Sequence, residues 1–134
     1  MKKRFKKWQY PKFDEGKLNK YNWMVQHKDG LDLGRFTDIG AFTYINAKNG
    51  VIIEEQVQIG SHCSIYSVST IDNKNGKVHI KRNACLGSHS VVMPCVTIGE
   101  NSIIGAFSFV NNDIPANCVA FGVPAKVVKR LKTK

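Results

Sequence analysis

A period of six residues runs through most of this 134-residue chain. Large aliphatic residues recur at every sixth position, and two short interruptions, after Gly50 and after Gly76, each reset the phase. A coiled coil repeats every 3.5 residues and an amphipathic helix every 3.6, so neither explains this spacing. Six is the period of a parallel β-helix built from hexapeptides. The thirteen positions are Leu33, Ile39, Ile45, Ile53, Ile59, Ile65, Ile71, Ile80, Leu86, Val92, Ile98, Ile104 and Val110.

The other positions of the hexad support the same all-β fold. Glycine often follows the aliphatic residue, where a turn needs backbone freedom, as at Gly34, Gly40, Gly60, Gly87, Gly99 and Gly105. A small or β-branched residue stands four positions after the aliphatic residue, where only a small side chain fits near a corner. Each hexad is therefore predicted to form one short strand and one turn, and three hexads one triangular coil. A single coil cannot bury its own faces, so coils must stack.

The repeat divides the chain into three parts. Residues 1–30 are basic and aromatic and are interpreted as an arm or cap over the first coil or over a neighbour. Residues 31–114 are predicted to form the β-helix, with a polar loop inserted at 72–79 that contains an Asn-Gly turn signal. This loop either builds a site or is a tolerated surface insertion. Residues 115–134 form a tail, in which a short basic helix is expected at 125–132.

The net charge of +10 comes from an excess of Lys and Arg at the two ends of the chain. Such an excess attracts phosphates, although a solvated basic tail is the simpler explanation. Basic and aromatic residues also interleave in nucleic-acid-binding arms, but no accompanying binding fold is visible, so we expect no nucleic-acid partner. No stretch approaches the roughly 20 apolar residues of a membrane helix, and no secretory signal is evident. We expect a cytoplasmic protein without membrane insertion.

Four cysteines, Cys63, Cys85, Cys95 and Cys118, form no CxxC motif and no zinc-ligand spacing. They are interpreted as free thiols in a reducing compartment, and no metal site is expected.

Four segments closely resemble the hexapeptide-repeat acetyltransferases, especially the galactoside/maltose type and the short sugar O- or N-acetyltransferases of surface-polysaccharide pathways. The narrowest of these signals is the Gly-Val-Pro-Ala-Lys ending, and the segments are 80–92, 94–99, 103–115 and 121–129. The resemblance implies a left-handed β-helix, although parallel crossovers are right-handed in about 98% of cases. It also implies transfer of an acetyl group from acetyl coenzyme A to a hydroxyl or amine of a sugar or nucleotide-linked sugar.

The resemblance further implies that coenzyme A binds in a groove between adjacent subunits of a homotrimer. By position it assigns cofactor contacts to Ser88, Ala106, Asn111, Lys126 and Lys129. Ser88 and Ala106 match residues along the pantetheine arm, although ordinary hexad geometry would also place them there. Lys126 and Lys129 match basic residues near the phosphorylated adenosine. Asn111 stands where the family often has threonine.

Acetyl transfer calls for a base that takes a proton from the acceptor, and histidine suits this because its pKa lies near neutrality. Thr70 stands where the family usually has this histidine. Three alternatives remain, namely His79, His62 and His89. A fourth possibility is that no protein base is needed, because an amine acceptor that binds unprotonated can attack unaided. Asp72 would then orient the acceptor.

Two other functions compete with acyl transfer. A zinc enzyme similar to the γ-carbonic anhydrases would need three histidines at a subunit interface, and the available histidines are not spaced one coil apart. A non-catalytic hexapeptide-repeat trimer would follow if the missing histidine reflects lost activity.

Overall fold

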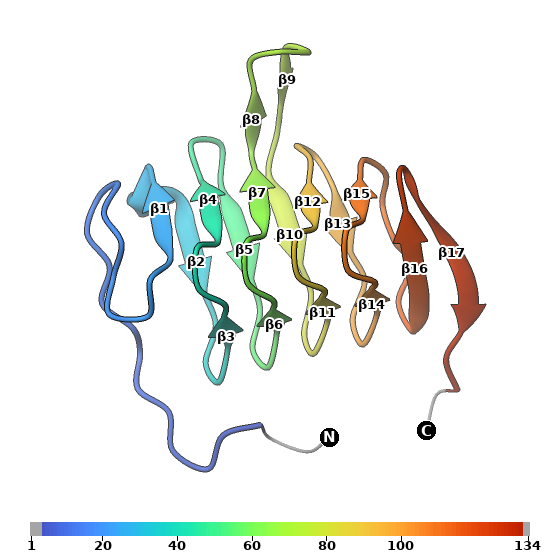
Figure 1. The fold of residues 1–134 in the computed structure, drawn as a ribbon, viewed down its shortest axis with the longest axis horizontal. Coiled ribbons are helices and arrows are strands. Elements are labelled where there is room, and N and C mark those ends of the chain that lie inside the picture. The colour runs from blue at the N-terminus through green and yellow to red at the C-terminus, as the bar shows by residue number, and fades with distance from the viewer. Residues whose placement is uncertain (1–3, 133–134) are drawn as a thin grey trace.

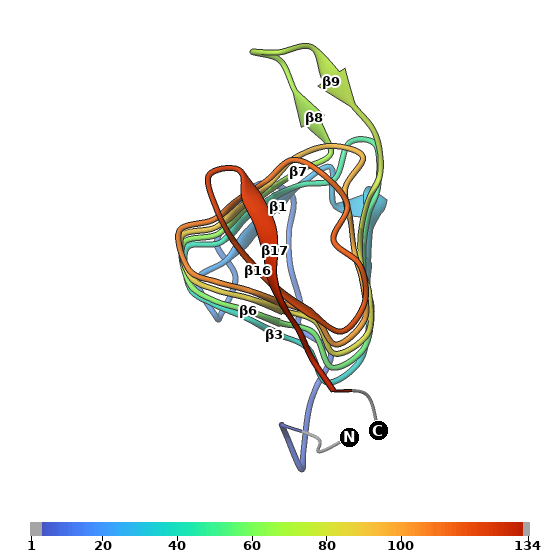
Figure 2. The same cartoon turned by 90° about the vertical axis from the view of Figure 1, so that its right-hand side faces the viewer.

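The computed structural model describes residues 4–132, and from β1 onward the chain coils into a triangular prism whose three sheets are parallel except for the last strand of one sheet (Figures 1 and 2). Sheet A comprises β1 (Met24–Gln26), β4 (Tyr44–Asn46), β7 (Ser64–Tyr66), β12 (Val91–Val92) and β15 (Phe109–Val110). Sheet B comprises β2 (Leu31–Leu33), β5 (Val51–Ile53), β10 (Val78–Ile80) and β13 (Thr97–Ile98). Sheet C comprises β3 (Asp38–Ile39), β6 (Gln58–Ile59), β11 (Cys85–Leu86), β14 (Ile103–Ile104), β16 (Cys118–Gly122) and β17 (Ala125–Arg130).

The strand register confirms the predicted parallel β-helix. In sheet A, Ile65 pairs with Ile45 on one side and with Val92 on the other, so equivalent hexad positions lie above one another. All three side chains are fully buried. Each coil passes from sheet A to B to C while it advances along the prism, and the path in Figure 1 is left-handed. Stacked aliphatic residues fill the prism and form its hydrophobic core.

Ile71 is an exception among the thirteen repeat positions, because its side chain is 99% exposed whereas the other twelve are buried, so the prediction of its place in the six-residue repeat is wrong. Ile80 takes the corresponding place in sheet B, where it pairs with Ile53. Ile71 lies instead in the turn of an antiparallel hairpin, formed by β8 (Val68–Ser69) and β9 (Lys74–Asn75), that projects from the corner between sheets A and B (Figure 2). The predicted insertion at 72–79 therefore starts too late and ends too late, since His79 belongs to strand β10.

The expected helix at 125–132 is also wrong. Strand β17 folds back on β16 as an antiparallel pair, with Lys126 opposite Phe121 and Lys129 opposite Val119. The last coil would otherwise leave the edge of sheet C open, and a strand can satisfy those backbone groups while a helix cannot. The β-branched Val127 and Val128 in this segment also favour a strand.

The N-terminal segment packs on the first coils of its own chain, which is one of the two arrangements predicted for this arm. The coils begin with β1 at Met24, and Trp23 immediately before it is buried. Trp8 Nε1 donates a hydrogen bond to the Thr37 carbonyl at 2.8 Å, and its ring lies 6.0 Å from that of Phe36. A short 3-10 helix, η1 (Lys28–Gly30), connects β1 to β2. Between residues 4 and 132 the structure contains no helix of the length and apolarity that a membrane span requires.

Candidate functional site

The turns that join sheet C to sheet A stack into one edge of the prism, called here the C–A corner. It consists of the turns at 40–43, 60–63, 87–90 and 105–108. Close packing between these turns requires glycine, because a Cβ on Gly87 would lie 2.5 Å from the backbone nitrogen of Ala106. A Cβ on Gly60 would likewise lie 2.6 Å from the nitrogen of Ser88. The structure therefore brings the predicted residues Ser88 and Ala106 together on adjacent coils.

A row of unpaired backbone donors runs along this corner. Within residues 4–132 the amide groups of Ser61, Ser88 and Ala106 donate no hydrogen bond, whereas the next residue in each turn donates to the preceding coil. For example, the amide of Phe107 donates to the Ser88 carbonyl at 3.0 Å. Adjacent coils lie about 4.8 Å apart, so the three free amides span about two coil spacings. Such donors can bind carbonyl oxygens or a developing negative charge.

An aromatic ladder covers the same corner. Phe42, His62, His89 and Phe107 occupy the left-handed position of the four turns, with φ angles of 63°, 58°, 61° and 61°. The His62 and His89 rings are stacked with centroids 4.7 Å apart, and His89 stacks on Phe107 at 4.8 Å. Neither histidine has a carboxylate partner among the described residues. Their stacking favours a structural role over proton transfer.

The predicted lysines stand at one end of this corner. Lys126 and Lys129 are exposed on β17, and β17 pairs with β16, the strand that follows β14 in sheet C. Gly105, which precedes Ala106, donates its amide to the Ala120 carbonyl at 2.9 Å, so β16 is one coil beyond Ala106. The order along the prism is therefore lysines, Ala106, Ser88 and then Ser61.

Asn111 does not join this group. It follows strand β15, so the whole width of sheet A separates it from the C–A corner of its own chain. Its side chain accepts a hydrogen bond from Asn112 Nδ2 at 3.2 Å.

His79 lies on the outer face of sheet B, between Ile52 and Thr97 in the register. Its Nε2 contacts a carboxylate oxygen of Glu54, and the other oxygen of Glu54 accepts the amide of Arg82 at 3.1 Å. A carboxylate only accepts hydrogen bonds, so Nε2 is the nitrogen that donates to Glu54, and in the neutral imidazole Nδ1 carries the lone pair. This arrangement orients the imidazole as a base. Sequence reasoning missed Glu54, because the two residues are 25 positions apart in the chain and meet only when adjacent coils stack.

A polar aromatic cluster on the outer face of sheet A was also missed. Tyr44 contacts Gln26 through its hydroxyl, accepts a hydrogen bond from Asn46 Nδ2 at 3.4 Å, and packs 5.8 Å from the Tyr66 ring. The only sequence signal is that these residues flank the inward-pointing Val25, Ile45 and Ile65 of β1, β4 and β7. The cluster lies beside the β8–β9 hairpin, because β7 leads directly into β8. Aromatic rings and amides of this kind suit a sugar.

The cysteines are free thiols, as predicted. Burial raises the pKa of Cys63 and of Cys85, so neither is an activated nucleophile. Among residues 4–132 no group of three or more His, Cys, Asp or Glu side chains is arranged to hold a metal ion.

Comparison with known proteins agrees with this architecture. The family described as bacterial transferase hexapeptide (six repeats) matches residues 77–112. Galactoside O-acetyltransferase of Escherichia coli K12 is 36% identical over 111 residues, which cover 72% of this chain and 55% of the relative. The chain belongs to the hexapeptide-repeat family.

Two solved structures share the fold of this hexapeptide-repeat protein. A galactoside acetyltransferase in complex with coenzyme A has a TM-score of 0.76 and 28% identity, over 82% of this chain and 60% of that one. A hexapeptide-repeat acetyltransferase of Vibrio cholerae complexed with acetyl coenzyme A has a TM-score of 0.78. At 24% identity, over 83% of this chain and 66% of that chain, the Vibrio protein supports the fold alone. The present chain spans about half the length of the curated relatives it matches.

Proposed function

We propose that this hexapeptide-repeat protein transfers an acetyl group from acetyl coenzyme A to a hydroxyl or amine of a sugar or nucleotide-linked sugar. The observation that carries the proposal is the line of free amides along the C–A corner, with Lys126 and Lys129 at one end. Coenzyme A is an elongated molecule with phosphates at one end and a thiol at the other. Clustered cations suit the phosphates, and the free amides suit the carbonyl oxygens of its pantetheine arm. The similar galactoside acetyltransferase was solved with coenzyme A.

This orientation assigns a role to each amide. The amides of Ala106 and Ser88 bind the carbonyl oxygens of the pantetheine arm. The thioester then lies one coil further from the lysines, beside Ser61. The free amide of Ser61 is the donor that stabilises negative charge on the thioester oxygen during attack.

We propose a homotrimer as the active form, because the candidate groups lie on opposite edges of sheet A. The free amides are at the C–A corner, whereas the β8–β9 hairpin and Asn111 are at the corner between sheets A and B, and His79 lies beyond that corner on the outer face of sheet B. One prism cannot bring its own two corners together. Closed threefold packing of prisms would place one corner against the other of a neighbour.

His79 is the proposed base, with Glu54 as its positioning residue. His79 Nδ1 accepts the proton of the acceptor hydroxyl or amine as the acceptor oxygen or nitrogen bonds to the thioester carbon. The Ser61 amide holds the carbonyl oxygen while the carbon–sulfur bond breaks. His79 then returns the proton to the departing sulfur, which leaves an acetylated acceptor and free coenzyme A.

The proposed acceptor is a sugar, which the Tyr44 and Tyr66 rings and Asn46 would contact beside the hairpin. We propose that the reaction takes place in the cytoplasm, as the four free cysteines favour. Acetylation of precursors for a surface polysaccharide is a use consistent with the sugar acetyltransferases it resembles.

Lys126 and Lys129 give a prediction about the affinity for coenzyme A and its dependence on salt. The double variant Lys126→Ala/Lys129→Ala is expected to weaken coenzyme A binding about 10-fold or more, because two contacts to charged phosphates are lost. The loss should shrink as salt is raised, since exposed charges are screened. Calorimetric titration at two ionic strengths measures both effects. Lys17→Ala, which removes an exposed lysine from the N-terminal segment, away from both corners, is the control and should bind normally.

The hairpin gives a second prediction. Replacing residues 69–74 by an Asn-Gly turn is expected to leave coenzyme A binding within about twofold, because the C–A corner is untouched. Acetyl transfer should fall about 10-fold or more, because closure around the acceptor is lost. Steady-state kinetics with the shortened chain measures both parameters. Unchanged turnover would show that the hairpin is only a surface insertion.

The function itself is tested with acetyl coenzyme A and a panel of amino sugars, hydroxylated sugars and nucleotide sugars. Release of the coenzyme thiol, followed with a thiol reagent, should require one class of acceptor and saturate with acetyl coenzyme A. Absence of both coenzyme A binding at millimolar concentration and thiol release would refute the proposal.

A further inference from the structure

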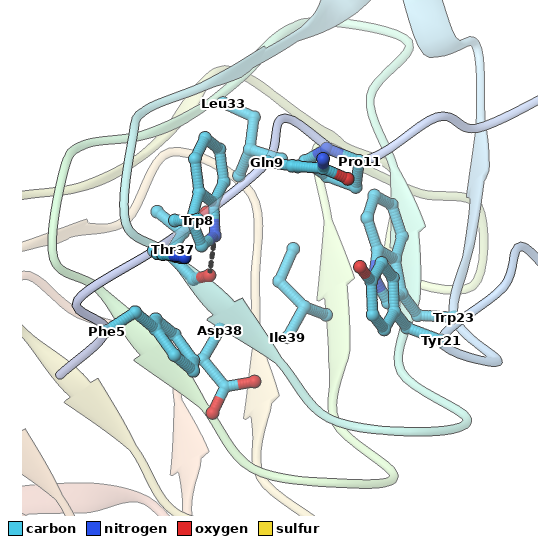
Figure 3. A pocket seen from close by; sticks show the side chains of 11 residues that line it. Phe5, Trp8, Gln9, Pro11, Tyr21, Trp23, Leu33, Thr37, Asp38 and Ile39 are labelled. Atoms are coloured by element: carbon cyan, nitrogen blue, oxygen red, sulfur yellow. Dashed lines mark hydrogen bonds between the residues drawn. The ribbon is translucent and has the colours of Figure 1, made fainter.

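A cavity opens between the N-terminal arm and the first coils (Figure 3). Its volume is about 170 Å³, and much of its lining is aromatic, with Phe5 and Trp8 from the arm and Tyr21 and Trp23 from the segment before β1. The Trp8 ring is held in place by its hydrogen bond to Thr37. A small cavity with several aromatic walls accepts a flat ring, because such a ring can stack on their faces.

Two cations adjoin this cavity. Lys7 lines it, and Arg4 lies next to it through Asp38, a residue that lines the cavity and also the adjoining groove. Arg4 Nε is 2.9 Å from Asp38 Oδ2. The two terminal amino groups of Arg4 have no hydrogen-bond partner among residues 4–132. A guanidinium held through Nε can present these two groups to phosphate oxygens.

The adjoining groove continues across sheet C to the proposed reaction centre. Arg4, Asp38 and Gln58 line it on the side of the cavity, Gly60 and Gly87 line it where it meets the C–A corner, and it extends along sheet C as far as Ile103 and Ile104 of β14. Gly60 precedes Ser61, whose amide is the proposed donor to the thioester oxygen. The aromatic cavity, the two cations and the groove therefore adjoin one another, and the groove meets the C–A corner at Gly60, beside the proposed reaction centre.

We propose that this sequence of features binds a nucleoside diphosphate sugar as the acceptor. The base enters the aromatic cavity, the diphosphate lies against Arg4 and Lys7, and the sugar extends along the groove toward Gly60. The inference rests on the proposed function and narrows its acceptor from any sugar to a nucleotide-linked one. The adenosine of coenzyme A is a poor occupant, because the phosphates of that molecule are assigned to the lysines at the opposite end of the corner.

The test is calorimetric titration of the full-length protein with uridine diphosphate and thymidine diphosphate, in the presence of saturating coenzyme A. Wild-type protein should bind one of them, and Arg4→Ala should weaken that binding about 10-fold or more. Arg4→Lys should restore only part of that binding, because an ammonium lacks the parallel N–H donors with which a guanidinium binds two phosphate oxygens. Lys12→Ala, in the same arm but in neither the cavity nor the groove, is the matched control and should bind normally. Inorganic pyrophosphate, which lacks the base, should bind about 10-fold more weakly than the nucleotide.

Several results would overturn this inference. One is that neither nucleotide binds at about 5 mM, and another is that wild type and Arg4→Ala bind the nucleotide equally. The inference would also fail if coenzyme A displaced the nucleotide, or if pyrophosphate bound as tightly as the nucleotide. Coenzyme A affinity is measured in parallel for every variant. If it is retained while nucleotide binding fails, the acyltransferase proposal stands and only the acceptor site is wrong.

Discussion

His79→Ala is expected to lower the rate constant for acetyl transfer about 100-fold or more, because a positioned base contributes roughly that factor. Binding of acetyl coenzyme A should not change, since His79 lies on sheet B and the free amides lie at the C–A corner. Single-turnover kinetics at saturating substrates separates the chemical step from binding. Glu54→Gln should reduce the rate by a smaller factor, because the amide keeps the contact to His79 but loses the charge that orients and stabilises the imidazolium.

The two other histidines are the matched controls for this experiment. His62→Ala and His89→Ala each remove an imidazole of the same size from an exposed position, but from the aromatic ladder rather than from a carboxylate pair. They are expected to retain most of the rate. A normal rate in His79→Ala would refute the assigned base. If all three variants were active with an amine acceptor, the amine would attack without a protein base.

Gly87→Ala is expected to abolish measurable coenzyme A binding and to lower the thermal midpoint. The added Cβ would lie 2.5 Å from the nitrogen and 2.8 Å from the Cα of Ala106, so the backbone of the next coil must move. That movement would break the alignment of the Ser88 and Ala106 amides. Titration with coenzyme A and a thermal melt measure the two effects.

A substitution at a second glycine distinguishes a loss of stability from a loss of the coenzyme A site. Gly99→Ala produces the same kind of backbone crowding, with its Cβ 2.2 Å from the nitrogen of Ala116, but at the corner between sheets B and C. It should also lower the thermal midpoint while the folded protein still binds coenzyme A. Equal loss of binding in both variants would contradict a site at the C–A corner.

The sequence predicts the coils well because each coil repeats the same local requirement. Ile45, Ile65 and Val92 are buried and stacked as the hexad period requires. Ile71 is an exception to the six-residue period, because a hairpin inserted at a corner can carry an aliphatic residue at the sixth position by chance. Spacing alone does not distinguish Ile71 from Ile80, and only strand pairing does so.

The end of the chain shows the same limit for a different reason. Residues 125–130 form a strand because the exposed edge of sheet C is available to them, and this edge exists only after the coils have stacked. The sequence of residues 125–130 does not by itself indicate that such an edge will be available for pairing. Secondary structure decided by a distant partner is therefore harder to predict than the repeat itself.

The candidate site divides along similar lines. Ser88 and Ala106 follow hexad glycines, so their meeting at one corner follows from the period. The contact of His79 with Glu54 depends on the longer coil that contains the hairpin, so it required the structure. The cavity beneath the arm also required it, because Trp8 and Thr37 belong to segments with no shared periodicity.

A crystal structure of the full chain with coenzyme A bound tests the central claim most directly. We expect three chains around a threefold axis, with the pantetheine carbonyls within about 3.2 Å of the Ser88 and Ala106 amides. The phosphates should face Lys126 and Lys129, and the sulfur should lie beside Ser61. Coenzyme A bound on another face of the prism, or in the reverse direction along this corner, would contradict the account.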